Sequence, residues 1–265
     1  MHIGKLFLIP TPLGDGETES VIPQGTLDVL RTLNIFIVEE LRTARRYLKK
    51  AGINTPIDDL TFFELNEHTP ETDIPALLQP ILKGNNIGLL SEAGAPAVAD
   101  PGANLIALAH SQHIEVVPLV GPSSLLLALM ASGLNGQSFT FNGYLPVKSL
   151  ERQQRIRQLE NRSIDWQQTQ IFIETPYRNH ALLNDLLLSC APNTLLCIAA
   201  NITMPDEYIH TKTITEWKKT TVAIHKKPCI FLIQGITKKE KKRVKKTYCI
   251  RDTNKKRYVN TEKQK

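Results

Sequence analysis

The sequence has few cysteines and no long apolar run. Its 4 cysteines are spaced too widely for the loops of about two to four residues that join zinc ligands, so we expect no metal site. The longest apolar run, residues 125–131, is far shorter than the ~20 residues of a membrane-spanning helix. Residues 6–9, before Pro10, are too few for the apolar core of a secretory signal. We therefore expect a cytoplasmic protein that does not enter a membrane.

The charge is distributed unevenly along the chain. The full sequence carries a net +6, from 32 basic and 26 acidic residues. Residues 237–265 contain 13 of the basic and 3 of the acidic residues, a net +10, which leaves −4 for residues 1–236. Because the apolar periodicity stops after Gly235, we expect this basic tail to lie outside the folded core.

Short β-type runs alternate with amphipathic helical patterns, which predicts two α/β domains with mainly parallel sheets. The expected strands are 5–9, 35–38, 60–65, 86–90, 115–119, 138–142, 170–174, 195–200 and 229–234. The expected helices are 26–33, 43–51, 74–83, 103–112, 123–132, 148–162 and 178–189. We divide the chain into an N-terminal domain (1–118), a C-terminal domain (119–236) and the basic tail (237–265).

The loops that follow the strands are the candidate sites, because ligands of parallel sheets bind beyond the carboxyl ends of the strands. The first loop has Gly14 and Gly16, but Glu19 stands where a G-x-G-x-x-G motif needs its third glycine, which argues against a pyrophosphate cradle. Residues 91–102 form a long loop of small residues, so they make either a tight connection or a shelf for a ligand. The serines at 123 and 124 cap the next helix, bind a ligand, or do both.

Six segments, matching in order and spacing over residues 5–235, carry a family resemblance. They are LIPTPLG (8–14), EELR (39–42), SEAGAP (91–96) with DPG (100–102), GPS (121–123), GYLP (143–146) with Lys148, and FIETPYR (172–178). The sequence resembles the tetrapyrrole methylase superfamily, and within it the bacterial enzymes that 2′-O-methylate a cytidine of small-subunit ribosomal RNA.

The resemblance implies a fold, a cofactor and partners. It implies two α/β domains with S-adenosylmethionine in the cleft between them, ribosomal RNA or the small ribosomal subunit as partner, and a homodimer. The cofactor contacts that it implies are Pro12, Ser91, Gly94, Ala95, Val98, Ser123, Ser124, Tyr177, Ala199 and Pro228.

The chain departs from the family pattern at several places, which leaves its substrate open. Glu40 and Leu41 stand where the family has Asp and Thr, and Glu92 stands where it usually has Asp. Residues 201–205 replace a stretch that usually carries an Arg-Glu pair, and the family does not as a rule end in so basic a tail. A tetrapyrrole methyltransferase and a non-catalytic RNA-binding relative therefore remain alternatives to the RNA methyltransferase.

Methylation of a ribose hydroxyl needs an acceptor for its proton, because that hydroxyl is a weak acid. Among the candidates Glu40, Glu92, Glu174 and His68 we choose Glu40, although it could equally pair with Arg42. We expect Arg42 and Arg178 to bind phosphate through their forked donors. Three further basic side chains, at one face of the helix 148–162, either contact RNA or are merely solvated. They are Lys148, Arg152 and Arg155.

The basic tail gives a testable prediction for RNA binding. If about 6 to 10 of its charges neutralise phosphates, affinity falls by roughly 10³ to 10⁵ between about 50 and 200 mM salt. Deleting residues 237–265 should therefore flatten the salt dependence of RNA binding and leave cofactor binding intact. Filter binding over a salt series measures the slope, and an unchanged slope would exclude the tail from RNA contact.

Overall fold

The computed structural model describes residues 3–236, which divide into two compact units. Of the described residues, unit 1 comprises 3–128 and Asn201–Tyr208, and unit 2 comprises Leu129–Ala200 and 209–236. This division falls inside helix α7 (Ser124–Ser132), after the boundary that we predicted at 118/119. The predicted basic tail, 237–265, lies outside the described residues.

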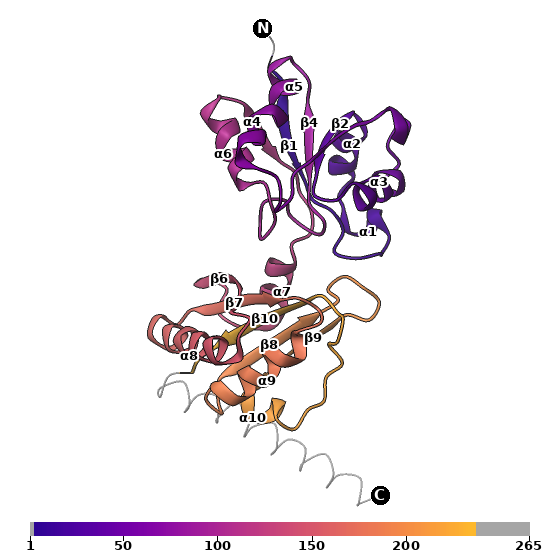
Figure 1. Cartoon of the computed structure of the whole chain (residues 1–265). Helices are drawn as coiled ribbons and strands as arrows, with labels where there is room; N and C mark the ends of the chain where they lie inside the picture. Colours follow the sequence, from indigo (N-terminus) through magenta and orange to yellow (C-terminus); the bar gives the residue numbers. More distant parts are fainter. Residues whose placement is uncertain (1–2, 237–265) are drawn as a thin grey trace, which may run out of the picture. The chain divides into compact units, whose positions relative to one another are not determined.

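Unit 1 is built on a five-stranded sheet in which every neighbouring pair is parallel (Figure 1). Its spatial order is β3-β2-β4-β1-β5. The strands are β1 (Lys5–Ile9), β2 (Ile35–Val38), β3 (Thr61–Glu64), β4 (Ile87–Leu90) and β5 (Glu115–Pro118). The carboxyl ends of all five strands therefore meet at one edge of the sheet, which is where the candidate loops begin.

Helices cover both faces of this sheet (Figure 1). Successive residues of β2 point to opposite faces. Phe36 and Val38 join the core under α2 (Gln24–Arg31) and α3 (Leu41–Lys50), whereas Ile37 joins the core on the other face. The helices of that second face are α4 (Ile74–Leu77), α5 (Gln79–Leu82) and α6 (Ala103–Ser111).

The helix expected at 74–83 is interrupted, because α4 and α5 are separate. Pro80 lies in the first turn of α5 and has no N–H to donate to the preceding turn. The apolar side chains Leu77, Leu78 and Ile81 are nevertheless buried on both sides of the break. Three further elements are too short to show periodicity in the sequence. They are α1 (Thr18–Val21) and the 3₁₀ turns Ile57–Asp59 and Glu71–Asp73.

Unit 2 has a five-stranded sheet of mixed direction, in the order β6-β7-β10-β8-β9. Its strands are β6 (Phe139–Tyr144), β7 (Thr169–Glu174), β8 (Leu195–Ala200), β9 (Tyr208–Thr213) and β10 (Cys229–Gln234). β6 and β7 are parallel, but β10 is antiparallel to both β7 and β8. The expected parallel arrangement is thus confirmed for unit 1 and corrected for unit 2. Between β8 and β10 the chain forms β9 and the four-residue helix α10 (Ile214–Trp217), and it lacks the long helix that a parallel crossover uses.

Two long helices, α8 (Ser149–Trp166) and α9 (Asn179–Ser189), pack against each other on the unit 2 sheet (Figure 1). Leu159 of α8 and Leu186 of α9 are completely buried. Within the sheet, the rings of Phe172 and Phe231 stack with centroids 6.2 Å apart. These contacts give unit 2 a hydrophobic core of its own.

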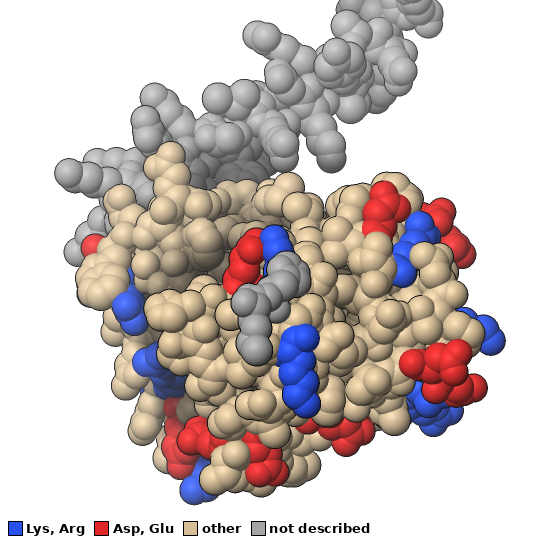
Figure 2. Space-filling view, turned by 90° about the horizontal axis from the view of Figure 1, so that it is seen from above, with Lys and Arg blue, Asp and Glu red and all other residues tan. Residues whose placement is uncertain are grey.

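The surface carries both signs of charge. Figure 2 shows a face on which acidic and basic side chains are interspersed, without a continuous field of one sign. Within residues 3–236, no helix has both the length and the apolar character needed to cross a membrane.

Candidate functional site

The loops after β1 and β4 are joined at the carboxyl edge of the unit 1 sheet. The Thr11 N–H donates to the Gly94 carbonyl at 2.9 Å, and the Gly94 N–H donates back to the Thr11 carbonyl at 3.0 Å. The Ser91 hydroxyl donates to the same Gly94 carbonyl at 2.7 Å. These bonds bring Pro12, Ser91 and Gly94, which are predicted cofactor residues, into neighbouring positions.

The loop after β5 lies against the loop after β1. A Cβ built on Gly121 would lie only 2.4 Å from the Cβ of Pro10, so this close approach requires glycine at position 121. Ser123 and Ser124 follow directly and are partly exposed. Three loops of unit 1 thus carry the predicted cofactor residues of the first half of the chain.

The loop after β4 holds a strained backbone. The angle φ is positive at Ala97 (62°) and Ala99 (67°), a conformation that costs an L-residue roughly 1–2 kcal/mol. It is also positive at Gly94 (84°) and Gly102 (132°), where glycine tolerates it. A Cβ on Gly94 would lie 3.0 Å from Leu13 Cδ2. Strain of this kind persists where the surroundings fix the backbone, and it is frequent at ligand-binding sites.

Beside these loops lies a pocket of about 170 Å³, lined by residues 11–16, by Ser91 to Ala93 and by side chains of α3. The Lys50 ammonium donates to the carbonyls of Asp15 (3.1 Å) and Gly16 (2.8 Å). Lys50 of helix α3 therefore holds the loop after β1 in place on one side of the pocket.

Glu40, the residue that we predicted as the base, caps helix α3. Its Oε1 accepts the N–H of Arg42 at 3.0 Å, and its Oε2 accepts the N–H of Thr43 at 2.7 Å. These two backbone hydrogen bonds lower the pKa of Glu40. A carboxylate whose oxygens are both engaged and whose pKa is lowered is a poor proton acceptor, so the prediction for Glu40 is corrected to a structural role.

The neighbouring residue Glu39 has the properties that Glu40 lacks. It is half-buried, and its Oε2 is buried without a hydrogen-bond partner among the described residues. Burial, together with the negative charges of Asp100, Glu92 and Glu67, raises the pKa of Glu39 to about 7. Burial and Glu92 likewise raise the pKa of Asp100 to about 6. This edge of the sheet therefore holds two carboxyl groups that exchange protons near neutral pH.

The other base candidates differ in their surroundings. The Glu92 carboxylate is exposed and accepts a hydrogen bond from the Thr43 hydroxyl. His68 is 85% exposed, with its Nε2 3.7 Å from the carboxylate of Glu67, so it lies on the open surface. Neither residue is buried as Glu39 is.

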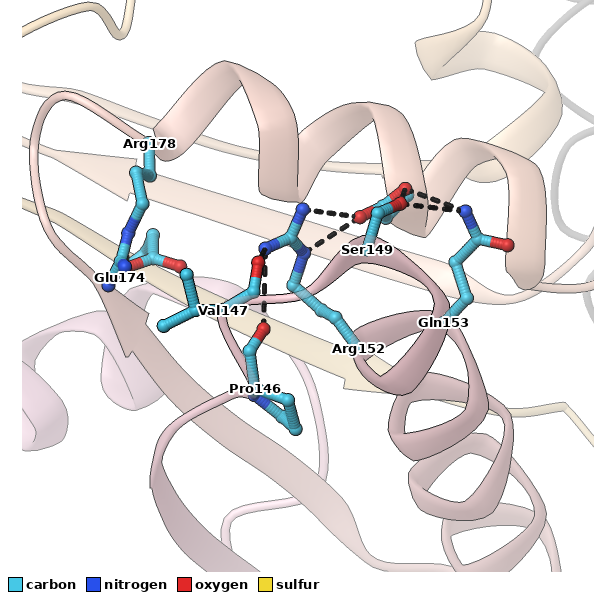
Figure 3. Close-up of polar contacts among 8 residues, drawn as sticks. Pro146, Val147, Ser149, Arg152, Gln153, Glu174 and Arg178 are labelled. Carbon is cyan, nitrogen blue, oxygen red and sulfur yellow. Dashed lines mark hydrogen bonds and ion pairs between the residues drawn. The ribbon is translucent and has the colours of Figure 1, made fainter.

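Glu174, the remaining candidate, is buried and forms an ion pair with the partly exposed Arg178 in unit 2 (Figure 3). Arg178 donates through Nε and Nη2 to Glu174 Oε1, at 3.0 and 2.6 Å. The side chain of Glu174 is 0% exposed, so Arg178 neutralises a charge that would be costly alone. The Nε and Nη2 donors of the Arg178 guanidinium are therefore used by Glu174. The predicted phosphate contact would have to use its Nη1.

Arg152, a predicted RNA contact, is 4% exposed and lies inside unit 2 (Figure 3). Its Nη2 lies 2.6 Å from Asp185 Oδ2, and its Nε donates to the same oxygen at 2.7 Å. Its Nη1 donates to the carbonyls of Val147 (2.7 Å) and Pro146 (3.3 Å). The prediction for Arg152 is wrong, because its guanidinium is fully used within the core and does not reach solvent.

The other predicted RNA contacts keep some exposure. Lys148 is 81% exposed and lies 3.3 Å from Glu151, while Arg155 is partly exposed. Arg42 is exposed at the start of α3. Their contact with RNA stays a prediction.

Three predicted cofactor residues belong to unit 2. Tyr177 is 72% exposed after β7, and Pro228 is exposed just before β10. Ala199 is 0% exposed within β8, where it pairs with Ile230 of β10. The methyl group of Ala199 is therefore packed inside unit 2, and the cofactor contact of Ala199 stays a prediction. The cofactor cleft between the two domains also stays a prediction.

Comparison with known proteins assigns the family. The model of the family described as Tetrapyrrole (Corrin/Porphyrin) Methylases matches residues 5–218. The chain belongs to the tetrapyrrole methylase family. Among residues 3–236 of this tetrapyrrole methylase, no group of three or more His, Cys, Asp or Glu side chains could hold a metal ion.

Curated relatives of this tetrapyrrole methylase bear a common name. A protein of Escherichia coli O157:H7, named ribosomal RNA small subunit methyltransferase I, is 30% identical over 235 residues, which cover 88% of this chain and 78% of the relative. A protein of the same name from Vibrio cholerae is 33% identical over 212 residues, covering 80% of this chain and 69% of the relative.

Solved structures agree on the fold. The methyltransferase CobJ superposes with a TM-score of 0.60 at 16% identity, covering 88% of this tetrapyrrole methylase and 94% of CobJ. A cobalt precorrin-4 methyltransferase, CbiF, gives a TM-score of 0.57 at 16% identity and covers 87% and 94% of the two chains. The two α/β units therefore have the fold of known methyltransferases.

Proposed function

We propose that this tetrapyrrole methylase transfers a methyl group from S-adenosylmethionine to a ribose 2′-hydroxyl of small-subunit ribosomal RNA. The observation that carries the proposal is the half-buried Glu39, with a pKa of about 7, at the same sheet edge as the joined loops of β1 and β4. Support for the RNA comes from the relatives named ribosomal RNA small subunit methyltransferase I.

The loops of unit 1 fit a cofactor that needs close approach of the backbone. Gly94, with φ at 84°, keeps the joined loops of β1 and β4 free of a side chain at that point, and the 46% exposed Val98 offers an apolar contact. Ser123 and Ser124 add hydroxyls at the start of α7. When bound, S-adenosylmethionine supplies a methyl group that its sulfonium already activates, so the protein's main task is alignment. The residues that would hold it in unit 1 are Pro12, Ser91, Gly94, Ala95, Val98, Ser123 and Ser124.

Glu39 would accept the proton that the 2′-hydroxyl loses as its oxygen is methylated. A base works best when its pKa lies near the working pH, and burial raises the pKa of Glu39 into that range. Its Oε2 has no hydrogen-bond partner among residues 3–236, so this oxygen would take the proton. We assign the proton transfer to Glu39 in place of Glu40.

Methylation of a tetrapyrrole carbon is the second candidate, because the matching structures include a cobalt precorrin-4 methyltransferase. Incubating the protein and labelled S-adenosylmethionine separately with small ribosomal subunits, naked ribosomal RNA and a porphyrinogen mixture discriminates the two. We expect label in the ribosomal subunits or the RNA. Label in the porphyrinogen alone would contradict the RNA proposal, and titration calorimetry that detects no cofactor binding would favour a non-catalytic relative.

A further inference from the structure

Unit 2 exposes a cluster of rings and charge next to the β7 loop. We call it the Tyr177 surface: Tyr177, His180, His225 and Lys226, all exposed. The rings of Tyr177 and His225 meet edge to face with centroids 6.4 Å apart, and those of His180 and His225 stack at 6.2 Å. The Lys226 ammonium lies 5.7 Å from the centre of the Tyr177 ring, within the range of a cation–π contact.

A buried framework fixes this cluster from beneath. Asn179, which is 0% exposed, donates from its amide to the carbonyls of Ile224 (3.0 Å) and Lys227 (2.8 Å). The Lys226 N–H donates to the carbonyl of Pro176 at 3.1 Å. Hydrogen bonds therefore connect the turn that carries His225 and Lys226 to the start of α9 and to the loop after β7.

The backbone of this turn is itself unusual. Lys226 has a φ of 59°, a left-handed conformation that is uncommon for a long side chain. The Asn179 and Pro176 hydrogen bonds hold Lys226 in that conformation, so its ammonium and the ring of His225 are presented together. A surface arranged in this way loses little conformational freedom when a ligand binds.

The chemistry of the cluster suits single-stranded nucleic acid. Every base has a flat face that stacks on Tyr or His rings, and lysine attracts the phosphates between the bases. Tyr177 is 72% exposed, which leaves most of its ring available for contact. Residues 1–236 carry a net charge of −4, and Figure 2 shows a face with basic and acidic side chains interspersed. A polyanion such as RNA would therefore have to bind at local basic sites of this kind.

We propose that the Tyr177 surface binds single-stranded RNA, stacking bases on the rings of His225 and His180 and pairing a phosphate with Lys226. This inference rests on the proposed function, because it takes RNA as the acceptor.

The test uses the full chain with His225→Ala and Lys226→Asn together, leaving Tyr177 in place. Asparagine removes the charge and tolerates the left-handed backbone. The matched control is His110→Ala with Lys83→Asn, two exposed residues of unit 1. Fluorescence anisotropy measures binding of labelled oligoadenylate and of an abasic ribose-phosphate oligomer of equal length.

We expect the His225/Lys226 variant to bind oligoadenylate about tenfold more weakly than the wild type, because stacking is lost. The abasic oligomer should lose much less, and the control variant should bind both as the wild type does. Unchanged melting temperature and cofactor affinity would show that the fold and the methyl-donor site are intact. Equal binding of oligoadenylate by variant and wild type would overturn the inference while leaving the proposed function standing. Absence of oligoadenylate binding by the wild type would likewise overturn the inference. Absence of methyl transfer to small ribosomal subunits and to their RNA would contradict the proposed function.

Discussion

Replacing Glu39 with glutamine should lower the methyl-transfer turnover by about 10²- to 10⁴-fold, the usual contribution of a general base. The glutamine is nearly the same size but cannot accept the proton. The affinity for S-adenosylmethionine should stay unchanged, because Glu39 is not among the residues that we assign to the cofactor. Single-turnover transfer to small ribosomal subunits and titration calorimetry measure the two quantities.

Glu40→Gln is the matched control, since it changes the adjacent carboxylate in the same way. Glu40 uses both oxygens to cap α3, so this variant should lose a little stability and keep its turnover. A large loss of turnover in Glu40→Gln, with Glu39→Gln fully active, would restore the base to the residue chosen from the sequence.

The same assignment predicts a pH dependence. Burial and neighbouring acids raise the pKa of Glu39 to about 7, so the carboxyl is protonated and inactive below that pH and becomes a base above it. The wild-type single-turnover rate should rise through pH 7 and then level off. Glu39→Gln should show no such rise, and a wild-type rate independent of pH between about 5.5 and 8.5 would argue against a titrating base.

Replacing Arg152 with alanine should destabilise the protein by about 3–5 kcal/mol, because it leaves the buried Asp185 without its cation. Burial works to raise the pKa of Asp185, but hydrogen bonds from Gln153, Ser149 and Arg152 outweigh it and the pKa is lowered. The folded state therefore holds this carboxylate charged. Urea unfolding followed by circular dichroism measures the change in the free energy of unfolding.

Arg155→Ala, on the same helix, provides the comparison. Arg155 is partly exposed, and its one described bond is a long one of 3.4 Å from Nη1 to Gln158. We expect a change within about 0.5 kcal/mol, as for most surface substitutions. Equal effects of the two alanine variants would contradict the structural role of Arg152.

Most of the fold could be predicted because its strands and long helices are periodic in hydrophobicity. The exceptions have identifiable causes. β9 is the polar segment YIHTKT, which lacks an apolar alternation, and α10 is too short for a helical pattern. The direction of β10 depends on how the chain returns after β9, a property that no local pattern in Cys229–Gln234 encodes. Pattern thus predicts elements better than it predicts their direction.

The site could be predicted only in part. The glycine and serine loops are predictable because small residues that directly follow a parallel strand let a ligand approach the backbone closely. Choosing between the adjacent acids requires knowing which one faces inward. β2 ends at Val38, so strand alternation does not reach Glu39, and Glu40 directly precedes α3. The partial burial of Glu39 and its raised pKa depend on the tertiary structure, which brings acids from distant loops close to it.

The prediction that Arg152 belongs to an RNA-binding face of α8 was wrong for a different reason. Lys148, Arg152 and Arg155 share one side of the helix by spacing, but spacing does not reveal that Asp185 of α9 lies opposite Arg152. A buried ion pair between helices is a tertiary feature. A helical pattern alone therefore cannot separate an arginine that binds RNA from one that supports the core.

The position of the transferred methyl group tests the central claim most directly. Small-subunit ribosomal RNA labelled from S-adenosylmethionine can be hydrolysed in alkali, which needs a free 2′-hydroxyl at each cleaved bond. We predict that the label is recovered in an alkali-resistant dinucleotide, because a 2′-O-methyl group blocks cleavage on its 3′ side. Label recovered in mononucleotides would place the methyl group on a base and contradict ribose methylation.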